Sequence, residues 1–202
     1  MGNLVVLNHL TLDGVMQAPG RPDEDPRGGF AHGGWALPRG DSVVEAFGGI
    51  AQVGGLLFGR RTYQDFAAFW PNQAGNPFTA VLNATQKYVA SATLAEPLPW
   101  SNSTLLTGDL AVAVAELKRQ LAKDLLIMGS GALIQSLMPH DLVDQYVLLI
   151  HPLIVGAGRR LFPEGSPPSN LQLIDTKTTN SGVIIATYRP AAPAGEARRS
   201  TR

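Results

Sequence analysis

Short apolar runs rich in valine, isoleucine and leucine alternate along the chain with segments of helical periodicity. This alternation is typical of an α/β domain, in which strands form a sheet and helices cover it. The predicted strands are Leu4–Leu10, Gly55–Phe58, Thr79–Leu82, Tyr88–Ala90, Ser103–Leu106, Leu125–Met128, Gln145–His151, Leu171–Thr178 and Val183–Tyr188. The predicted helices are Ser42–Val53, Arg61–Ala68, Leu110–Ala122 and Ala132–Met138. Asn180, Ser181 and Gly182 separate the last two strands, which predicts a mixed sheet ending in an antiparallel hairpin.

Residues that begin and end helices support these boundaries. Asp41 and Asp109 each precede apolar residues at helical spacing and are predicted N-caps. Pro139 is expected to end the last predicted helix, because proline cannot donate a main-chain hydrogen bond.

The chain has 202 residues, of which 45% are hydrophobic, which suits one well-packed domain that we assign to residues 1–190. Residues 191–202 lack apolar periodicity and are predicted to be a disordered tail. The 16 basic residues balance the 16 acidic ones, so we expect no nucleic-acid partner. The longest apolar run, Tyr146–Val155, is too short to cross a bilayer, and the N-terminus does not resemble a secretory signal. Without cysteine, the composition is compatible with a cytoplasmic protein that has no membrane association.

The segment Asp13–Gly40 is rich in glycine and proline and shows no periodicity. A loop of this length within a compact domain is usually a lid or binding loop, or else mobile. We interpret it as a lid.

A first anion-binding motif follows the predicted strand Gly55–Phe58. Gly59 leads from this strand into a helix whose first residues are Arg60, Arg61 and Thr62. Free amides at a helix start attract anions, and the planar fork of arginine can bind two phosphate oxygens. The alternative is a solvated arginine pair beside an ordinary helix start.

A second strand-to-helix motif consists of Gly129, Ser130, Gly131, Ala132 and Leu133. Its glycines would let the backbone approach a pyrophosphate, but the spacing is not that of a Rossmann fingerprint. Together the two motifs predict a nucleotide site, because the carboxyl ends of parallel strands open on the same edge of a sheet.

The ordered series of these motifs resembles the dihydrofolate-reductase-like superfamily, and within it the reductase domain of the riboflavin-biosynthesis deaminase–reductase. The resemblance extends over nearly the whole chain, here without a preceding zinc deaminase domain. The blocks that carry it are Leu10–Gly14 (LTLDG), Gly59–Tyr63 (GRRTY), Lys87–Ser91 (KYVAS), Gly129–Leu133 (GSGAL), Leu142–Tyr146 (LVDQY), His151–Gly158 (HPLIVGAG) and Arg160–Phe162 (RLF).

The resemblance implies a three-layer α/β/α fold, a bound NADPH or NADP+ and a homodimer formed through the late strands. By analogy, Arg60 or Arg61, with Thr62 and Ser91, would contact the adenosine 2′-phosphate and the neighbouring phosphate. The residues that would face the pyrophosphate and nicotinamide belong to the second motif, Gly129–Leu133. Dihydrofolate reductase has a cis Gly-Gly bond here, and a cis bond before Ser130 would cost roughly 3 kcal/mol.

The implied activity is hydride transfer from NADPH to a small heterocycle or imine-like substrate. The reductions of 5-amino-6-(5-phosphoribosylamino)uracil and of dihydrofolate are the two precedents. A non-catalytic NADP-binding or dimerisation module that kept the fold without the chemistry is the alternative.

Two carboxylates are candidates for the catalytic acid. Asp13 follows the first strand within the LTLDG block, and Asp41 follows the lid, although helix capping explains Asp41 better. Trp35, Tyr63 and Phe66 are candidates for an aromatic substrate slot, to which Phe69 and Trp70 could also belong. Their helical spacing is equally typical of core residues.

We expect no metal site. The four histidines lack the paired spacing of a zinc centre and are His9, His32, His140 and His151. His9 and His151 are interpreted as satisfied strand residues.

Overall fold

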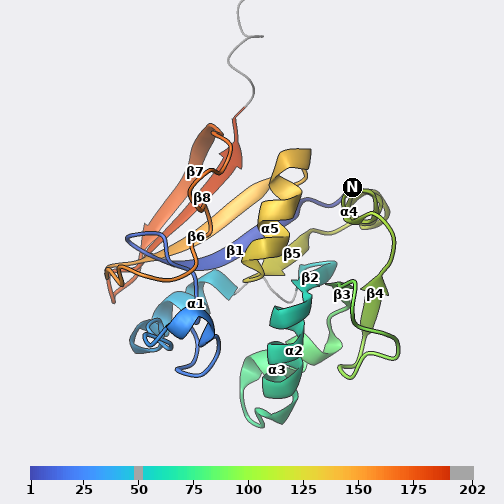
Figure 1. Cartoon of the computed structure of the whole chain (residues 1–202), viewed down its shortest axis with the longest axis horizontal. Helices are drawn as coiled ribbons and strands as arrows, with labels where there is room; N and C mark the ends of the chain where they lie inside the picture. Colours follow the sequence, from blue (N-terminus) through green and yellow to red (C-terminus); the bar gives the residue numbers. More distant parts are fainter. Residues whose placement is uncertain (48–51, 192–202) are drawn as a thin grey trace, which may run out of the picture.

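A computed structural model describes residues 1–47 and 52–191, which form an eight-stranded sheet covered by helices (Figure 1). The strands are β1 (Leu4–Thr11), β2 (Gly55–Gly59), β3 (Lys87–Ala90), β4 (Ser103–Leu106), β5 (Leu125–Met128), β6 (Gln145–His151), β7 (Leu171–Thr178) and β8 (Ile184–Pro190). The α-helices are α1 (Asp41–Phe47), α2 (Arg60–Phe69), α3 (Pro77–Ala84), α4 (Leu110–Gln120) and α5 (Gly131–Leu137).

The strand order in the sheet is β4-β3-β2-β5-β1-β6-β8-β7. Strands β1 to β6 are parallel to one another, whereas β8 is antiparallel to both β6 and β7. The predicted mixed sheet with a terminal antiparallel hairpin is therefore confirmed. Strands β2 and β5, which precede the two predicted anion-binding motifs, are direct neighbours.

The helices form a layer on each face of the sheet, because alternate strand residues point to opposite faces. On one face α4 and α5 bury Val114, Leu117 and Ile134 against Val6 and Ile127. The opposite cluster joins residues of α2 and α3 to the other strand face and includes Leu7, Phe58, Tyr63, Leu82 and Met128. This arrangement is the predicted three-layer α/β/α sandwich.

The predicted strand Thr79–Leu82 is wrong, because these residues lie within α3. Asn76 caps this helix by accepting a hydrogen bond from the Phe78 amide at 3.0 Å, and Pro77 occupies its first turn. At the other end, the buried Lys87 Nζ donates to three main-chain carbonyls, those of Leu82, Asn83 and Thr85, at 2.7–3.2 Å. A short apolar run does not distinguish strand from helix, whereas these end signals do.

Other boundaries agree more closely with the predictions. Asp109 caps α4 through the Val112 amide at 2.9 Å, as predicted. Helix α5 ends at Leu137, and Pro139 belongs to the 3-10 turn Met138–His140 that follows it. The predicted helix Ser42–Val53 is described as α1 up to Phe47; its positions 48–51, like the predicted disordered tail from 192 onward, lie outside the described residues.

The lid, residues 13–40, is folded over the carboxyl edge of the sheet rather than lying free. It has a small core of its own, in which Val15, Phe30 and Trp35 are buried. The main chain tethers it to the segment after β6, where the Leu153 carbonyl accepts from the Leu12 amide and the Arg159 carbonyl from the Met16 amide, both at 2.8 Å. None of the helices in the described ranges has the length and apolar character that a membrane span requires.

Candidate cofactor and substrate site

A cavity of about 1440 Å³ opens at the carboxyl edge of the parallel strands, between this edge and the lid. Its walls come from the lid, from the ends of β1 to β5 and from α2 and α5. Pockets for drug-sized ligands measure about 300–1,000 Å³, so this cavity is large enough for a dinucleotide together with a second small molecule. The edge is also where open α/β sheets bind their ligands.

The two strand-to-helix motifs touch each other in this cavity. The Gly59 amide donates to the Ser130 hydroxyl oxygen at 3.0 Å, and Gly129 lies against the Thr62 side chain. Gly129 and Ser130 both have left-handed backbone conformations, with φ angles of 65° and 58°. Glycine accepts this geometry freely, whereas for serine it costs roughly 1 kcal/mol. The sequence therefore keeps a strained serine where its hydroxyl joins the two turns.

The peptide bond before Ser130 is trans, since within residues 1–47 and 52–191 the cis bond is that between Glu96 and Pro97. The backbone nevertheless approaches the cavity closely, because a Cβ atom on Gly131 would lie 2.6 Å from the Met16 sulfur. The second motif thus presents main chain to the cavity.

At the start of α2 the donors are well suited to phosphate. Gly59 offers no side-chain cap, so the first amides of this ten-residue helix are free. Arg60 donates to Gln64 at 3.3 Å, and Arg61 is exposed; both line the cavity. Cations at a helix N-terminus oppose the helix dipole, which makes this pair unfavourable until an anion binds.

Ser91 lies beside this group, just after β3. Its hydroxyl oxygen accepts from the amides of Thr93 and Leu94 at 3.1 and 3.0 Å. The hydroxyl hydrogen remains available as a donor to the cavity. All the residues predicted to bind the cofactor, from Gly59–Thr62, Ser91 and Gly129–Leu133, thus line the same cavity.

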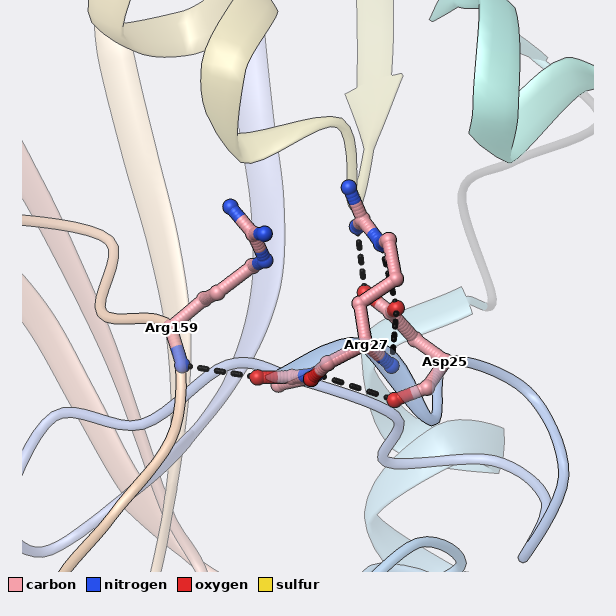
Figure 2. Close-up of polar contacts among 4 residues, drawn as sticks. Asp25, Arg27 and Arg159 are labelled. Atoms are coloured by element: carbon pink, nitrogen blue, oxygen red, sulfur yellow. Dashed lines mark hydrogen bonds and ion pairs between the residues drawn. The ribbon is translucent and has the colours of Figure 1, made fainter. Parts of the chain in front are cut away.

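Two arginines that sequence reasoning missed complete the polar wall. Gln17 fixes their backbone: its amide nitrogen donates to the carbonyls of Asp25 and Arg27, and its oxygen accepts from the Arg159 amide, each at 2.9 Å. Figure 2 shows the guanidinium groups of Arg27 and Arg159 extending in the same direction, toward the turn between β5 and α5. The only sequence signal was a second arginine pair, Arg159–Arg160, outside any strand-to-helix context.

The two guanidinium groups differ in their partners. Arg27 forms an ion pair with Asp25, in which Nε and Oδ1 are 2.5 Å apart. Burial raises the pKa of Asp25, but hydrogen bonds and charge from Arg27, with a further contribution from Arg159, leave it lowered. The Arg159 guanidinium has no hydrogen-bond or ion-pair partner among the described residues, and it is therefore free to bind an anion.

The structure places neither candidate acid on the cavity. The Asp13 carboxylate accepts from the Thr11 hydroxyl at 2.6 Å and from the amides of Val155 and Gly156 at 3.2 and 2.8 Å. The Thr11 hydrogen bond, with those from the two amides, lowers the pKa of Asp13 to about 2. A carboxylate that is ionised at neutral pH cannot donate a proton, and Asp13 instead fixes the turn after β6.

Asp41 joins α1 to the terminal hairpin. It accepts from the Ser181 hydroxyl at 2.6 Å and from the Ser181 amide at 3.0 Å, and the former hydrogen bond is the main cause of its lowered pKa. Asp41 is the first residue of α1 rather than the predicted N-cap before it. Its carboxylate accepts from the next amide in the helix, that of Ser42 at 2.9 Å, and from Ser181, which lies 140 residues away.

The aromatic candidates divide between core and cavity. Tyr63 is fully buried, and its hydroxyl accepts from the Trp100 amide at 3.0 Å. Trp35 is buried in the lid core and donates to the Gln17 carbonyl at 2.7 Å. Phe66 lines the cavity together with Phe69 and Trp70. The aromatic wall is thus formed by the far half of α2 and the turn after it.

The match to known proteins extends over most of the chain. Residues 4–185 match the family model of the RibD C-terminal domain. The chain belongs to this family. Two Bacillus subtilis proteins, "Uncharacterized protein YyaP" and "Uncharacterized protein YwjB", are each 29% identical to it, over 145 and 71 residues respectively. The YyaP match covers 69% of this chain and 75% of YyaP, and the YwjB match covers 35% and 41%.

Solved structures of other proteins share this fold. A putative riboflavin biosynthesis protein from Shewanella sp. PV-4 has a TM-score of 0.67 at 22% identity, and the match covers 95% of this chain and all of the other. A pyrimidine reductase-like protein from Corynebacterium diphtheriae has a TM-score of 0.59 at 13% identity, with coverage of 95% and 93%. The bifunctional deaminase/5-amino-6-(5-phosphoribosylamino)uracil reductase of Thermotoga maritima has a TM-score of 0.60 at 13% identity, over 94% of this chain and 57% of that protein.

Proposed function

We propose that this protein is an NADPH-dependent reductase of a small, flat heterocyclic or imine-like substrate. The observation that carries the proposal is one large cavity with two arginines and an uncapped helix start at the beginning of α2 and an aromatic wall at its end. Membership of the RibD C-terminal domain family supports it, since relatives of this fold are named as pyrimidine or aminouracil reductases.

The residues present fit this cofactor. Arg60, Arg61, Thr62 and Ser91 would hold the 2′-phosphate end, where the cationic pair is unfavourable without an anion. The main chain of Gly129–Leu133 would lie along the pyrophosphate and nicotinamide side. When bound, NADPH supplies a hydride; the protein orients it, excludes water beneath the lid and positions the acceptor.

Arg159 and Arg27 have a defined place in this proposal. Their guanidinium groups extend toward the turn between β5 and α5 (Figure 2), and both arginines line the same cavity as Arg60 and Arg61. Arg159 would bind a second anionic group of the cofactor or substrate. Arg27 is already neutralised by Asp25, so it would contribute less.

Cofactor binding is tested first. NADPH at one hundred times its dissociation constant should stabilise the protein by about 2.7 kcal/mol, or about 5–10 °C in melting temperature, and NADH should do less at equal concentration. No shift with millimolar NADPH or NADP+ would eliminate the cofactor proposal. Oxidation of NADPH with a panel of pyrimidines, pterins and quinones then tests the reaction; binding without oxidation would favour a non-catalytic module.

We further propose a homodimer formed through the terminal hairpin. Strand β7 is the edge of the sheet and is exposed along nearly its whole length. Large apolar side chains are exposed here, namely Leu173, Ile174 and Ile184. An exposed apolar edge strand in an otherwise covered sheet is suited to pairing with a second copy.

A further inference from the structure

Two histidines from neighbouring strands form a direct hydrogen bond at the floor of the site. His9 on β1 and His151 at the end of β6 are separated by 142 residues in sequence, but their Nδ1 and Nε2 atoms are 2.9 Å apart. The parallel register of β1 and β6 pairs Thr11 with His151. Because His9 is two residues before Thr11, the rings of His9 and His151 lie on the same face of the sheet. Trp35 of the lid packs its ring edge-on against His151, with centroids 5.1 Å apart.

Both imidazoles are uncharged at neutral pH. Burial, with the proximity of His151, lowers the pKa of His9 to about 3. Burial and the charge of Arg39 lower the pKa of His151 to about 4, against the opposing charge of Asp41. A neutral pair has one proton between the two facing nitrogens, so one ring donates and the other accepts.

The surroundings of His151 decide which ring donates. Its Nδ1 atom is buried and has no partner among the described residues. Orphaned buried N–H donors are rarer than under-satisfied acceptors, so this nitrogen is the one without hydrogen. His151 therefore carries its hydrogen on Nε2 and donates it to His9 Nδ1, which leaves His9 with its hydrogen on Nε2.

The remaining donor of His9 faces the cavity. His9 lines it together with Leu7 and Asn8 of β1 and Val43 of α1. Its Nε2 atom has no partner in the described part of the chain and is not enclosed by protein atoms.

Each of the three carboxylates on the same cavity has at least one partner, although Asp65 Oδ2 is buried with none among the described residues. Asp25 pairs with Arg27 and Asp65 pairs with Arg21. Glu24 accepts from the Gly20 and Arg21 amides at 2.6 and 3.1 Å. These carboxylates belong to the lid and to α2, whereas on β1 the titratable side chain that lines the cavity is His9, a neutral donor.

We propose that His9 Nε2–H is the hydrogen-bond donor that binds and polarises the substrate, and that His151 is the positioning residue that fixes its tautomer. The substrate class that follows is a neutral flat heterocycle that presents a carbonyl oxygen or imine nitrogen to β1. A cationic ring that presents only N–H groups to His9 would leave its Nε2–H unpaired and would be rejected. The hydrogen bond draws electrons from the carbon that accepts hydride. Hydride addition leaves a negative charge on the polarised oxygen or nitrogen, which His9 Nε2–H stabilises and which then takes a proton from water, so His9 stays neutral throughout. The role of His9 in the reaction rests on the proposed function, whereas the tautomers assigned to His9 and His151 do not.

Nitrogen-15 NMR of histidine-labelled protein tests the tautomers independently of cofactor and activity. Single His-to-Gln variants assign the four rings. We expect His9 and His151 to remain neutral, each with its hydrogen on Nε2, from pH 7.5 to 5. Protonation of His9 on Nδ1, or a charge on either ring above pH 5, would overturn the proposal.

The positioning role is tested with two variants of one residue. His151→Gln retains an N–H donor toward His9 and should keep its Nε2–H tautomer. His151→Leu removes the donor and should convert His9 to a mixture of tautomers. If His9 keeps a pure Nε2–H tautomer in both variants, His151 does not position it. If the leucine variant does not fold, His151→Phe takes its place as the variant without a donor, and a pure Nε2–H tautomer of His9 in that variant contradicts the positioning role.

Ligand binding is tested with uracil and 2,4-diaminopyrimidine in the presence of NADP+. Millimolar uracil should shift the His9 Nε2–H resonance saturably, and His9→Phe should weaken uracil binding at least tenfold while changing NADPH affinity less than twofold. Diaminopyrimidine should bind at least tenfold more weakly than uracil. Uracil that leaves this resonance unchanged contradicts the proposal, whereas failure of NADPH to bind the wild type contradicts the proposed function and leaves the tautomer result standing.

Discussion

Replacing Arg60 and Arg61 together by alanine separates the phosphate end of the proposed site from the rest. Both side chains start α2 and line the cavity, and the Gln64 contact of Arg60 is the one side-chain hydrogen bond found for the pair in the described ranges. A hydrogen bond between a charged donor and a phosphate contributes about 1.5–3 kcal/mol. Loss of one to two such bonds at the exposed helix start should weaken NADPH binding about 10–100-fold, whereas NADH, which lacks the 2′-phosphate, should change less than threefold.

The same substitution should not destabilise the free protein. Each arginine opposes the helix dipole by about 0.3–1 kcal/mol, so its removal should leave the melting temperature unchanged or raise it by a few degrees. Calorimetric titration with NADPH and NADH, with thermal melts of the free protein, provides both readouts. Arg119→Ala is the matched control, since Arg119 is exposed on α4, paired with Glu116 and absent from the cavity wall. An unchanged ratio of NADPH to NADH affinity would refute the assignment.

Three further predictions concern stability and assembly. Lys87→Met should cost about 2–4 kcal/mol in urea denaturation, because three carbonyls lose their donor. Burial lowers the pKa of Lys87 to about 8 from 10.5. Between these pH values the unfolded chain binds one more proton than the folded protein, so the stability of the wild type relative to Lys87→Met should rise from pH 8 to 10. A stability difference that does not change with pH would contradict this. Ser130→Ala should lower the free energy of unfolding by about 1 kcal/mol, because the hydrogen bond to Gly59 is lost. Ser130→Gly should stay near the wild-type stability, because glycine relieves the strain of the left-handed conformation. Equal losses for the two variants in urea denaturation would exclude strain relief. Ile174→Lys should convert a dimer to a monomer in size-exclusion chromatography with light scattering, and a wild-type monomer at micromolar concentration would refute the dimer itself.

Local patterns were sufficient for most of the architecture. The periodicity of strands and helices and the Asn180–Gly182 turn depend on residues close in sequence, and the mixed sheet with its hairpin followed from them. The two strand-to-helix motifs were found in the same way, because a glycine at a helix start is a local signal. The one misassigned element, Thr79–Leu82, is an apolar run too short to show a period, and only Asn76 and Pro77 before it indicated a helix.

Tertiary structure decided which side chains face the site. Asp13 and Asp41 were acceptable acids in sequence, but each also accepts from a residue more than 100 positions away, Gly156 and Ser181 respectively. Arg159 reaches the cavity because the lid packs on the segment after β6. The His9–His151 hydrogen bond requires the register of β1 against β6, which no spacing in the sequence encodes. By itself the sequence determined the fold and the positions of the two strand-to-helix turns, since those depend on neighbouring residues. The polar floor of the cavity depends on contacts between distant segments, which only the packed sheet and lid create.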